Sequence, residues 1–142
     1  MTMAKQILDS KGHDVWSIGP DEFVIDAIRL MADKGIGALL IMEGEKLVGI
    51  VSERDYARKV ILQGRSSQQT QVKDIMTISV LCARPQQTVE ECLTLMTDKR
   101  VRHLPVVDGE RVDGMLSIGD LVKAIITEQE FTIKQLEHYI NG

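Results

Sequence analysis

The chain has 142 residues, of which 44% are hydrophobic and 27% are charged, and its net charge at pH 7 is −4. These values are ordinary for a soluble globular protein that buries roughly two-thirds of its unfolded surface. The acidic balance argues against non-specific binding to nucleic acid or to an anionic membrane. No apolar run approaches the ~20 residues that span a bilayer, and the N-terminus lacks the apolar core of a signal peptide. A cytoplasmic location is therefore expected.

The N-terminal part of the chain predicts two helices separated by a short strand. Residues 3–10 have the pattern of a short amphipathic helix, and residues 15–18 predict a brief strand. Asp21 is expected to be the N-cap of the next helix, because apolar residues then recur at i, i+3, i+4 and i+7. Gly35, preceded by a lysine, is expected to end that helix.

A β-hairpin and a further helix are expected next. Residues 38–42 form a continuous apolar run that suits a strand covered on both faces. The glycine-containing turn at 43–46 leads into a second apolar run at 47–51, which predicts the hairpin. A helix is then expected from Ser52 to about Leu62, followed by a polar, turn-rich linker.

The chain contains an internal repeat. Residues 49–55 read GIVSERD, and residues 114–120, 65 positions later, read GMLSIGD. When 15–60 is aligned on 80–125 without a gap, 13 of the 46 pairs are identical. The chain is therefore a tandem repeat of one supersecondary unit.

The second copy repeats the element order of the first. We expect a strand near 80–83, a helix containing Val89 and Met96, strands at 104–107 and 112–116, and a helix from Ser117 to about Thr127. Each copy is thus a β-α-β-β-α unit, which places the chain in the α/β (α+β) class. One copy has too little core of its own, so the two are expected to pack about a pseudo-twofold axis.

The expected domain boundaries follow from the repeat. The C-terminal tail has apolar residues at near-helical spacing on two faces, so it can dock on a second subunit or fold back on its own chain.

The predicted segments are a lead-in helix at 1–10, the first repeat at 11–64, a linker at 65–75, the second repeat at 76–127 and a C-terminal helix at 128–142.

A Ser-x-x-Asp motif precedes a predicted helix in both copies, as Ser52 with Asp55 and as Ser117 with Asp120. The simplest interpretation is a capping box, duplicated together with its helix. The functional interpretation is a ligand site, because a helix N-terminus and a serine hydroxyl suit a phosphate. A carboxylate three residues later can accept both hydroxyls of a ribose.

The copies differ beside this motif. The first has Gly37 and Ala38, which leave room for a flat base, and the second has Arg102 and His103, which can donate to phosphate. Arg54 adds a further cation in the first copy. The nearby cations Lys99 and Arg100 are equally well explained as a solvated helix end.

No catalytic arrangement is evident. The three histidines are scattered, and the sequence contains neither a His-x-x-x-His metal motif nor a Gly-x-x-x-x-Gly-Lys phosphate loop. Cys82 and Cys92 match no zinc signature, and small residues occupy the equivalent positions of the first copy, so structural thiols are expected. No catalytic residue or metal site is predicted, and the chain is not expected to be an enzyme.

The order of a strand, a proline, a helix, an apolar hairpin and the Gly-x-x-Ser-x-x-Asp motif resembles the CBS domain. Residues 102–108 (RHLPVVD) and 74–77 (DIMT) are also similar to sequences typical of that family. The resemblance covers about residues 10–127. The chain is similar to stand-alone bacterial proteins made of one tandem CBS pair, often called a Bateman module.

This resemblance implies a non-catalytic sensor that binds an adenine nucleotide in clefts between the repeats. AMP is expected first, with ADP, ATP, NAD or S-adenosylmethionine as the other ligands. Asp55 and Asp120 match the ribose-binding Asp, and Ser52 and Ser117 match the residue that contacts phosphate. The other matching positions are Ser17, Ile18, Gly37, Ala38, Arg54, Cys82, Arg102, His103, Pro105 and Gly119.

The two sites are not expected to be equivalent, because Gly119 stands where the first copy has Arg54 and the second copy lacks a counterpart of Gly37. The resemblance also implies a homodimer formed through helices and a signal read by a separate protein target. The alternative is a nucleic-acid-binding or protein-adapter module without a nucleotide ligand. Nucleic-acid binding would fall steeply with salt, whereas a nucleotide pocket would respond less.

Overall fold

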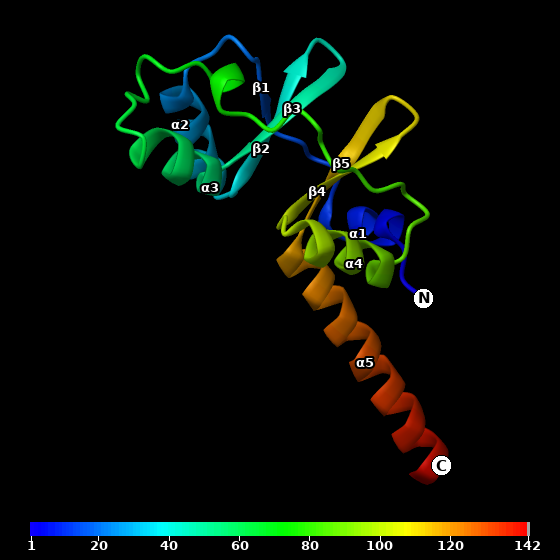
Figure 1. The fold of residues 1–142 in the computed structure, drawn as a ribbon. Helices are drawn as coiled ribbons and strands as arrows, with labels where there is room; N and C mark the ends of the chain where they lie inside the picture. The colour runs from blue at the N-terminus through cyan, green and yellow to red at the C-terminus, as the bar shows by residue number, and fades with distance from the viewer. Residues whose placement is uncertain (142) are drawn as a thin grey trace. The chain divides into compact units, whose positions relative to one another are not determined.

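The structure is a computed structural model, and it describes residues 1–141. Its contacts divide the chain into two units (Figure 1). The first-repeat unit is Val15–Val80, and the second-repeat unit combines Met1–Asp14 with the chain from Leu81 onward. The N-terminal segment therefore packs with the repeat that lies farther from it in sequence.

The first-repeat unit is built on a three-stranded sheet with the order β1-β2-β3. Strand β1 runs parallel to β2, and β2 is antiparallel to β3. The elements of this unit are β1 (Ser17–Ile18), α2 (Val24–Lys34), β2 (Ala38–Glu43), β3 (Lys46–Ser52), α3 (Glu53–Tyr56), the π-helical turn η1 (Ala57–Ile61) and the 3₁₀ turn η2 (Val72–Asp74).

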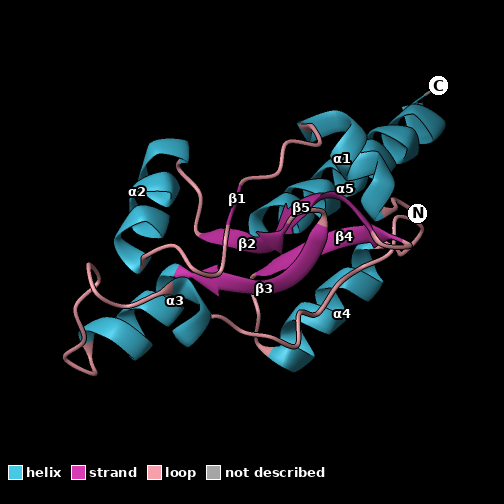
Figure 2. Ribbon diagram, turned by 90° about the horizontal axis from the view of Figure 1, so that it is seen from above, coloured by secondary structure: helices cyan, strands magenta, loops and turns pink. Residues whose placement is uncertain are grey.

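The second-repeat unit has an antiparallel hairpin with three helices (Figure 2). A parallel bridge between Ala83 and Val106 replaces the first strand of the repeat. The elements of this unit are α1 (Ala4–Lys11), α4 (Val89–Lys99), β4 (His103–Asp108), β5 (Arg111–Ser117) and α5 (Ile118–Asn141).

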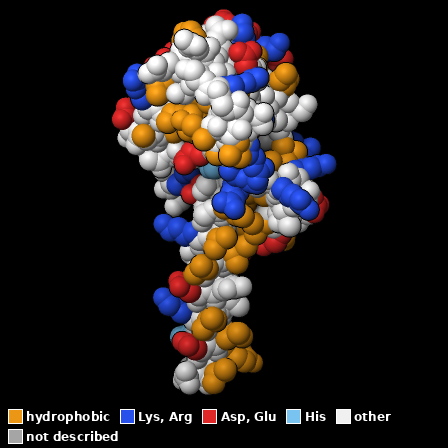
Figure 3. Space-filling model, turned by 60° about the vertical axis from the view of Figure 1, so that its left-hand side comes forward, with side chains coloured by type: hydrophobic (Ala, Val, Ile, Leu, Met, Phe, Trp, Pro, Cys, Tyr) orange, Lys and Arg blue, Asp and Glu red, His pale blue; other side chains and the backbone are white. Residues whose placement is uncertain are grey.

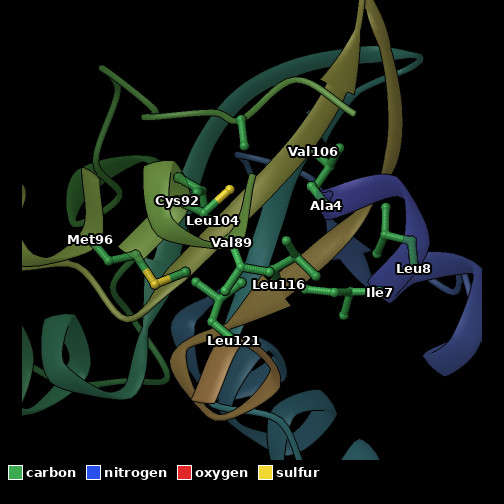
Figure 4. Packing of buried hydrophobic residues seen from close by; sticks show 11 residues of the cluster. Ala4, Ile7, Leu8, Val89, Cys92, Met96, Leu104, Val106, Leu116 and Leu121 are labelled. Atoms are coloured by element: carbon green, nitrogen blue, oxygen red, sulfur yellow. The ribbon is translucent and has the colours of Figure 1, made fainter. Parts of the chain in front are cut away.

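Each unit has its own hydrophobic core. In the second-repeat unit, Ile7 and Leu8 from α1 belong to one buried cluster with Leu116 from β5 and Leu121 from α5 (Figure 4). In the first-repeat unit, Val72 and Ile75 from the segment after the repeat join the core. Both units therefore complete their cores with a segment that the sequence repeat does not contain.

The expected fold class and most expected elements are confirmed. Both hairpins form, and their register shifts fall at equivalent places, between Ile41 and Met42 and between Val106 and Val107. No helix within residues 1–141 is both long and apolar enough to cross a membrane. Residue 142, the last of the expected C-terminal helix, lies outside the described residues.

The prediction that Asp21 caps the second helix is wrong. The N-cap of α2 is Phe23, and no side chain caps it. Backbone carbonyls take that role, since Val24 N donates to Thr70 O at 2.8 Å and Ile25 N donates to Ser67 O at 2.9 Å. The linker thus satisfies the free N–H groups of the helix start, and a side-chain cap is not required.

Two further expectations are corrected. The strand expected near 80–83 reduces to the bridge at Ala83. The helix expected to end near Thr127 continues without a break as α5 to Asn141, because no glycine or proline occurs in residues 120–141. The side chains from 129 to 141 are exposed, so this segment does not fold back on the described chain.

Candidate functional site

Ser52 and Asp55 form a reciprocal capping box at the start of α3. Ser52 Oγ accepts a hydrogen bond from Asp55 N at 3.2 Å, and Asp55 Oδ2 accepts from Ser52 N at 2.9 Å. Lys59 Nζ lies 3.1 Å from Asp55 Oδ1 and donates to Ile75 O at 2.9 Å. The Asp55 carboxylate is therefore held through both oxygens, with 18% of its side chain exposed.

Ser117 and Asp120 make the same arrangement at the start of α5. Asp120 Oδ2 accepts from Ser117 N at 2.8 Å, and Ser117 Oγ accepts from Asp120 N at 3.2 Å. Lys11 Nζ contacts the same Oδ2 at 2.7 Å and donates to Met115 O at 2.9 Å. The capping interpretation is thus confirmed in both copies, and in both a lysine joins the carboxylate to a backbone carbonyl.

The charge of Asp120 is stabilised by these contacts. Burial opposes ionisation of the carboxyl group, but the hydrogen bonds from Lys11 and Ser117 outweigh it and hold the pKa of Asp120 below its usual value. The side chain remains 23% exposed. A ligand hydroxyl would therefore meet an ionised acceptor at neutral pH.

Strand pairing brings the next candidate residues to each capping box. In the first-repeat unit Ala38 pairs with Ser52, and Glu53 N donates to Gly37 O at 3.0 Å. In the second-repeat unit His103 pairs with Ser117, and Ile118 N donates to Arg102 O at 2.9 Å. The same backbone frame therefore presents small residues in one unit and basic residues in the other.

The candidate residues of the preceding strands lie farther along the sheets. Ser17 pairs with Leu40 in the first-repeat unit, and in the second Cys82 directly precedes Ala83, whose N–H donates to Pro105 O at 2.8 Å. Ser17 is exposed, whereas the side chains of the candidates Ile18, Ala38 and Pro105 are buried. The three buried residues would contribute to a site through their backbone atoms and by holding the neighbouring residues in place.

The two units differ at the second position after the capping serine. Arg54 is exposed at this position in α3, and Gly119 is exposed at the equivalent position in α5. The first turn of the helix therefore carries a guanidinium in α3 and none at the equivalent position of α5. The side chains around the two capping boxes are therefore not the same.

The lysines that hold the two aspartates were not identified from the sequence. Lys59 lies four residues after Asp55 on one helical turn, so a search for i, i+4 ion pairs could have found it. Lys11 lies 109 residues before Asp120, and no local pattern relates them.

The two thiols do not form a disulfide. Burial raises the pKa of the Cys92 thiol to about 11, and the Glu91 carboxylate adds to the effect. Burial also raises the pKa of Cys82. In residues 1–141 no group of three or more His, Cys, Asp or Glu side chains is arranged to hold a metal ion.

Comparisons with known proteins agree with the repeat. The sequence profile of the CBS domain matches residues 5–61 and 72–127. The chain is 39% identical to the mitochondrial CBS domain-containing protein CBSX3 of Arabidopsis thaliana, over 99% of this chain and 73% of that protein. The structure of a protein with CBS domains from Burkholderia ambifaria MC40-6 is 53% identical, with a TM-score of 0.87, over 90% of this chain and 96% of that one.

A more distant structure contains ligands. The CBS domain pair of protein MJ0100, in complex with 5-methylthioadenosine and S-adenosyl-L-methionine, is 25% identical to this chain. The match covers 90% of this chain and 98% of the MJ0100 chain, with a TM-score of 0.80. The duplicated Ser-x-x-Asp helix starts, the two matched regions and these neighbours lead to one conclusion: the chain belongs to the CBS-domain family and contains a tandem CBS pair, a Bateman module.

Proposed function

We propose that the chain is an adenine-nucleotide sensor whose ligand contacts Asp55 or Asp120 through the ribose and Ser52 or Ser117 through a phosphate. The observation that carries the proposal is that the same arrangement of side chains and backbone occurs in both units. In both units a half-buried serine and aspartate cap a helix beside the end of a β-hairpin. CBS pairs are regulatory modules, and the pair of MJ0100 binds adenosyl compounds.

The ligand class follows from the donors and acceptors. An ionised carboxylate accepts the two hydroxyls of a ribose, and the N–H groups of a helix start favour an anion. Gly37 and Ala38 add no large side chain beside Ser52, which suits an adenine base. AMP is the first candidate, with ADP, ATP and NAD as larger alternatives.

The sensor has no catalytic function in this proposal. Proteins that consist of CBS pairs are regulatory, and no catalytic family is indicated for this chain. The readout would be a separate protein that distinguishes the ligand-bound from the free form. Cytoplasmic location and a homodimer complete the proposal.

The nucleic-acid alternative would use exposed cations such as Arg111, but this arginine is paired with carboxylates. Arg111 Nε lies 2.9 Å from Asp113 Oδ1, and another guanidinium nitrogen lies 3.8 Å from Asp108 Oδ2. Two carboxylates thus neutralise this arginine on the hairpin. The cations that remain, Lys99, Arg100 and Arg102, are few for binding a phosphate backbone.

Calorimetric titration of the whole protein with AMP, ADP, ATP, NAD and S-adenosylmethionine tests the proposal, with GMP as the control. We expect selective binding of one adenosyl ligand and its loss in the variant Asp55→Ala/Asp120→Ala. If the unaltered protein binds none of these ligands, the proposal is wrong. Binding that survives both substitutions would disprove the ribose assignment.

The chain offers a matched control for the loss of a helix cap. Thr88 and Glu91 form the same reciprocal box at the start of α4, with Glu91 N donating to Thr88 Oγ1 at 3.2 Å. The variant Glu91→Ala should lose some stability, because it removes the carboxylate that accepts from Thr88 N, and it should keep its ligand affinity. An equal loss of affinity in this variant would attribute the aspartate effect to capping alone.

A further inference from the structure

Helix α5 carries a long apolar face that its own chain leaves exposed. Within the described part of α5, only Leu121 is fully buried. Hydrophobic side chains run along the projecting part of the helix in Figure 3. Those that share one face, with their exposed fractions, are Val122 (46%), Ile126 (50%), Ile133 (54%), Leu136 (57%) and Ile140 (78%).

These five residues, here called the α5 seam, follow a heptad pattern. Ile126, Ile133 and Ile140 are seven residues apart and occupy position a, while Val122 and Leu136 occupy position d. The remaining d position holds Gln129. A shallow groove over Ile118, Val122 and Ile126 begins the same face at the N-terminal end of the helix. Such 3–4 spacing is typical of a helix that packs against another helix along its length.

We propose that the α5 seam is a self-association surface that forms a parallel two-stranded coiled coil with the α5 of a second copy. Ile at a with Leu at d, as at Ile133 and Leu136, favours two parallel strands. In that arrangement each d residue faces its own counterpart, so the two Gln129 side chains meet and can hydrogen-bond to each other. A buried polar side chain requires a hydrogen-bond partner, so this layer favours the register in which the two Gln129 side chains meet.

The charge of α5 argues against a membrane surface or a nucleic acid as the occupant of the seam. The helix has four acidic residues, Asp120, Glu128, Glu130 and Glu137, and only two lysines. A helix that lies on a membrane surface usually has a polar face rich in Lys and Arg. A nucleic acid would likewise require an excess of cations.

Three of the five seam residues lie beyond the CBS domains, and Val122 and Ile126 lie within the second one. The CBS match ends at residue 127, so Ile133, Leu136 and Ile140 lie beyond it. From Val122 to Ile140 the seam extends about 28 Å at 1.5 Å per residue. The inference does not depend on nucleotide binding, and its experiments are done without nucleotide.

Sedimentation equilibrium of the whole protein over a range of concentrations is the first test. We expect a dimer for the unaltered chain and about a hundredfold or greater weakening in Ile133→Glu/Leu136→Glu. The control Phe131→Glu/Gln135→Glu adds the same charge to exposed positions off the seam of the same helix. It should dimerise like the unaltered protein.

Three outcomes would overturn the proposal. The unaltered protein could remain monomeric, which would leave the seam to a different partner. The seam variant could dimerise like the unaltered chain, which would place the interface elsewhere. The control variant Phe131→Glu/Gln135→Glu could weaken dimerisation as much as the seam variant does. Added charge, and not loss of the seam contact, would then explain the weakening.

Disulfide crosslinking tests the parallel orientation. In a parallel pair the two Leu136 positions face each other, so Leu136→Cys should give a covalent dimer under mild oxidation. Phe131→Cys points away from the seam and should not, and the unaltered protein reports the background from Cys82 and Cys92. Crosslinking through position 131 but not 136 would contradict the proposed arrangement.

Discussion

Lys11 Nζ lies 2.7 Å from Asp120 Oδ2, although the two residues are 109 positions apart in sequence. The equivalent carboxylate of the other repeat, Asp55, takes its lysine from position 59 of the same helical segment. Both lysines also donate to a backbone carbonyl. One ion-pair arrangement is therefore completed by different parts of the chain in the two units.

The Lys11–Asp120 pair should couple α1 to the start of α5. In a double-mutant cycle of Lys11→Met and Asp120→Asn, urea unfolding at neutral pH should give a coupling free energy of about 0.5–1 kcal/mol. The cycle of Lys59→Met with Asp120→Asn should give none. No coupling in the first cycle would show that the ion pair contributes nothing to stability.

The same coupling should depend on pH. The pKa of Asp120 is held below its usual value in the folded state, so the stabilisation is present above the unfolded-state pKa and is lost as the pH falls through the folded-state pKa. Repeating the cycle at successively lower pH should show the coupling decrease. A coupling that is constant through the acid range would mean that another group titrates there.

Gly114 is required by the close approach of α1. A Cβ at this position would lie 2.6 Å from Leu8 Cδ2 and 3.0 Å from Leu8 Cδ1. Gly114→Ala should therefore destabilise the protein by about 1–3 kcal/mol in chemical denaturation. Gly119→Ala is the control, because its nearest contact is Ser117 Oγ at 3.6 Å.

A second variant tests whether Leu8 is the cause. Leu8→Ala alone leaves a cavity, but it also removes the atoms that the new Cβ would meet. The double variant Leu8→Ala/Gly114→Ala should lose less stability than the two single losses added together. Simple additivity would show that the two side chains do not compete for the same space.

Arg100 holds a backbone conformation that glycine adopts more easily. Its φ is 55° and its ψ is 41°, and Gly35 ends the equivalent helix with φ 64° and ψ 39°. Arg100→Gly should raise the free energy of unfolding by about 1 kcal/mol, because the left-handed conformation is costly for a residue with a Cβ. Gly35→Ala should lower it by a similar amount, and a loss of stability in Arg100→Gly would show that its side chain matters more than its backbone.

His13 should titrate above its usual pKa of 6.5. Its Nδ1 lies 2.9 Å from Asp113 O and its Nε2 lies 3.0 Å from Asp9 Oδ1, and both contacts favour the protonated ring. Its contribution to stability is full below the unfolded-state pKa and is lost as the pH rises through the folded-state pKa. NMR titration should show the raised pKa and a lower one in Asp9→Asn; an unchanged pKa would exclude the contact with Asp9.

Local patterns predicted the parts of the site that lie within one turn of helix. Ser52 and Asp55 are three residues apart, so the capping geometry depends only on the helix start, and the repeat implied the same for Ser117 and Asp120. Local patterns misled at Asp21, because carbonyls from a distant linker satisfy the start of α2. They also failed to show that α5 continues without a break from Ile118 to Asn141.

By itself the sequence determined the duplication, the hairpins, the capping boxes and the family, because each depends on residue types at short, regular spacing. Only the tertiary structure decided that α1 packs in the second-repeat unit and that Lys11 reaches Asp120. It also showed that the apolar face of α5 stays exposed. Contacts between segments more than a hundred residues apart depend on the complementary shapes of whole elements, and no local periodicity records them.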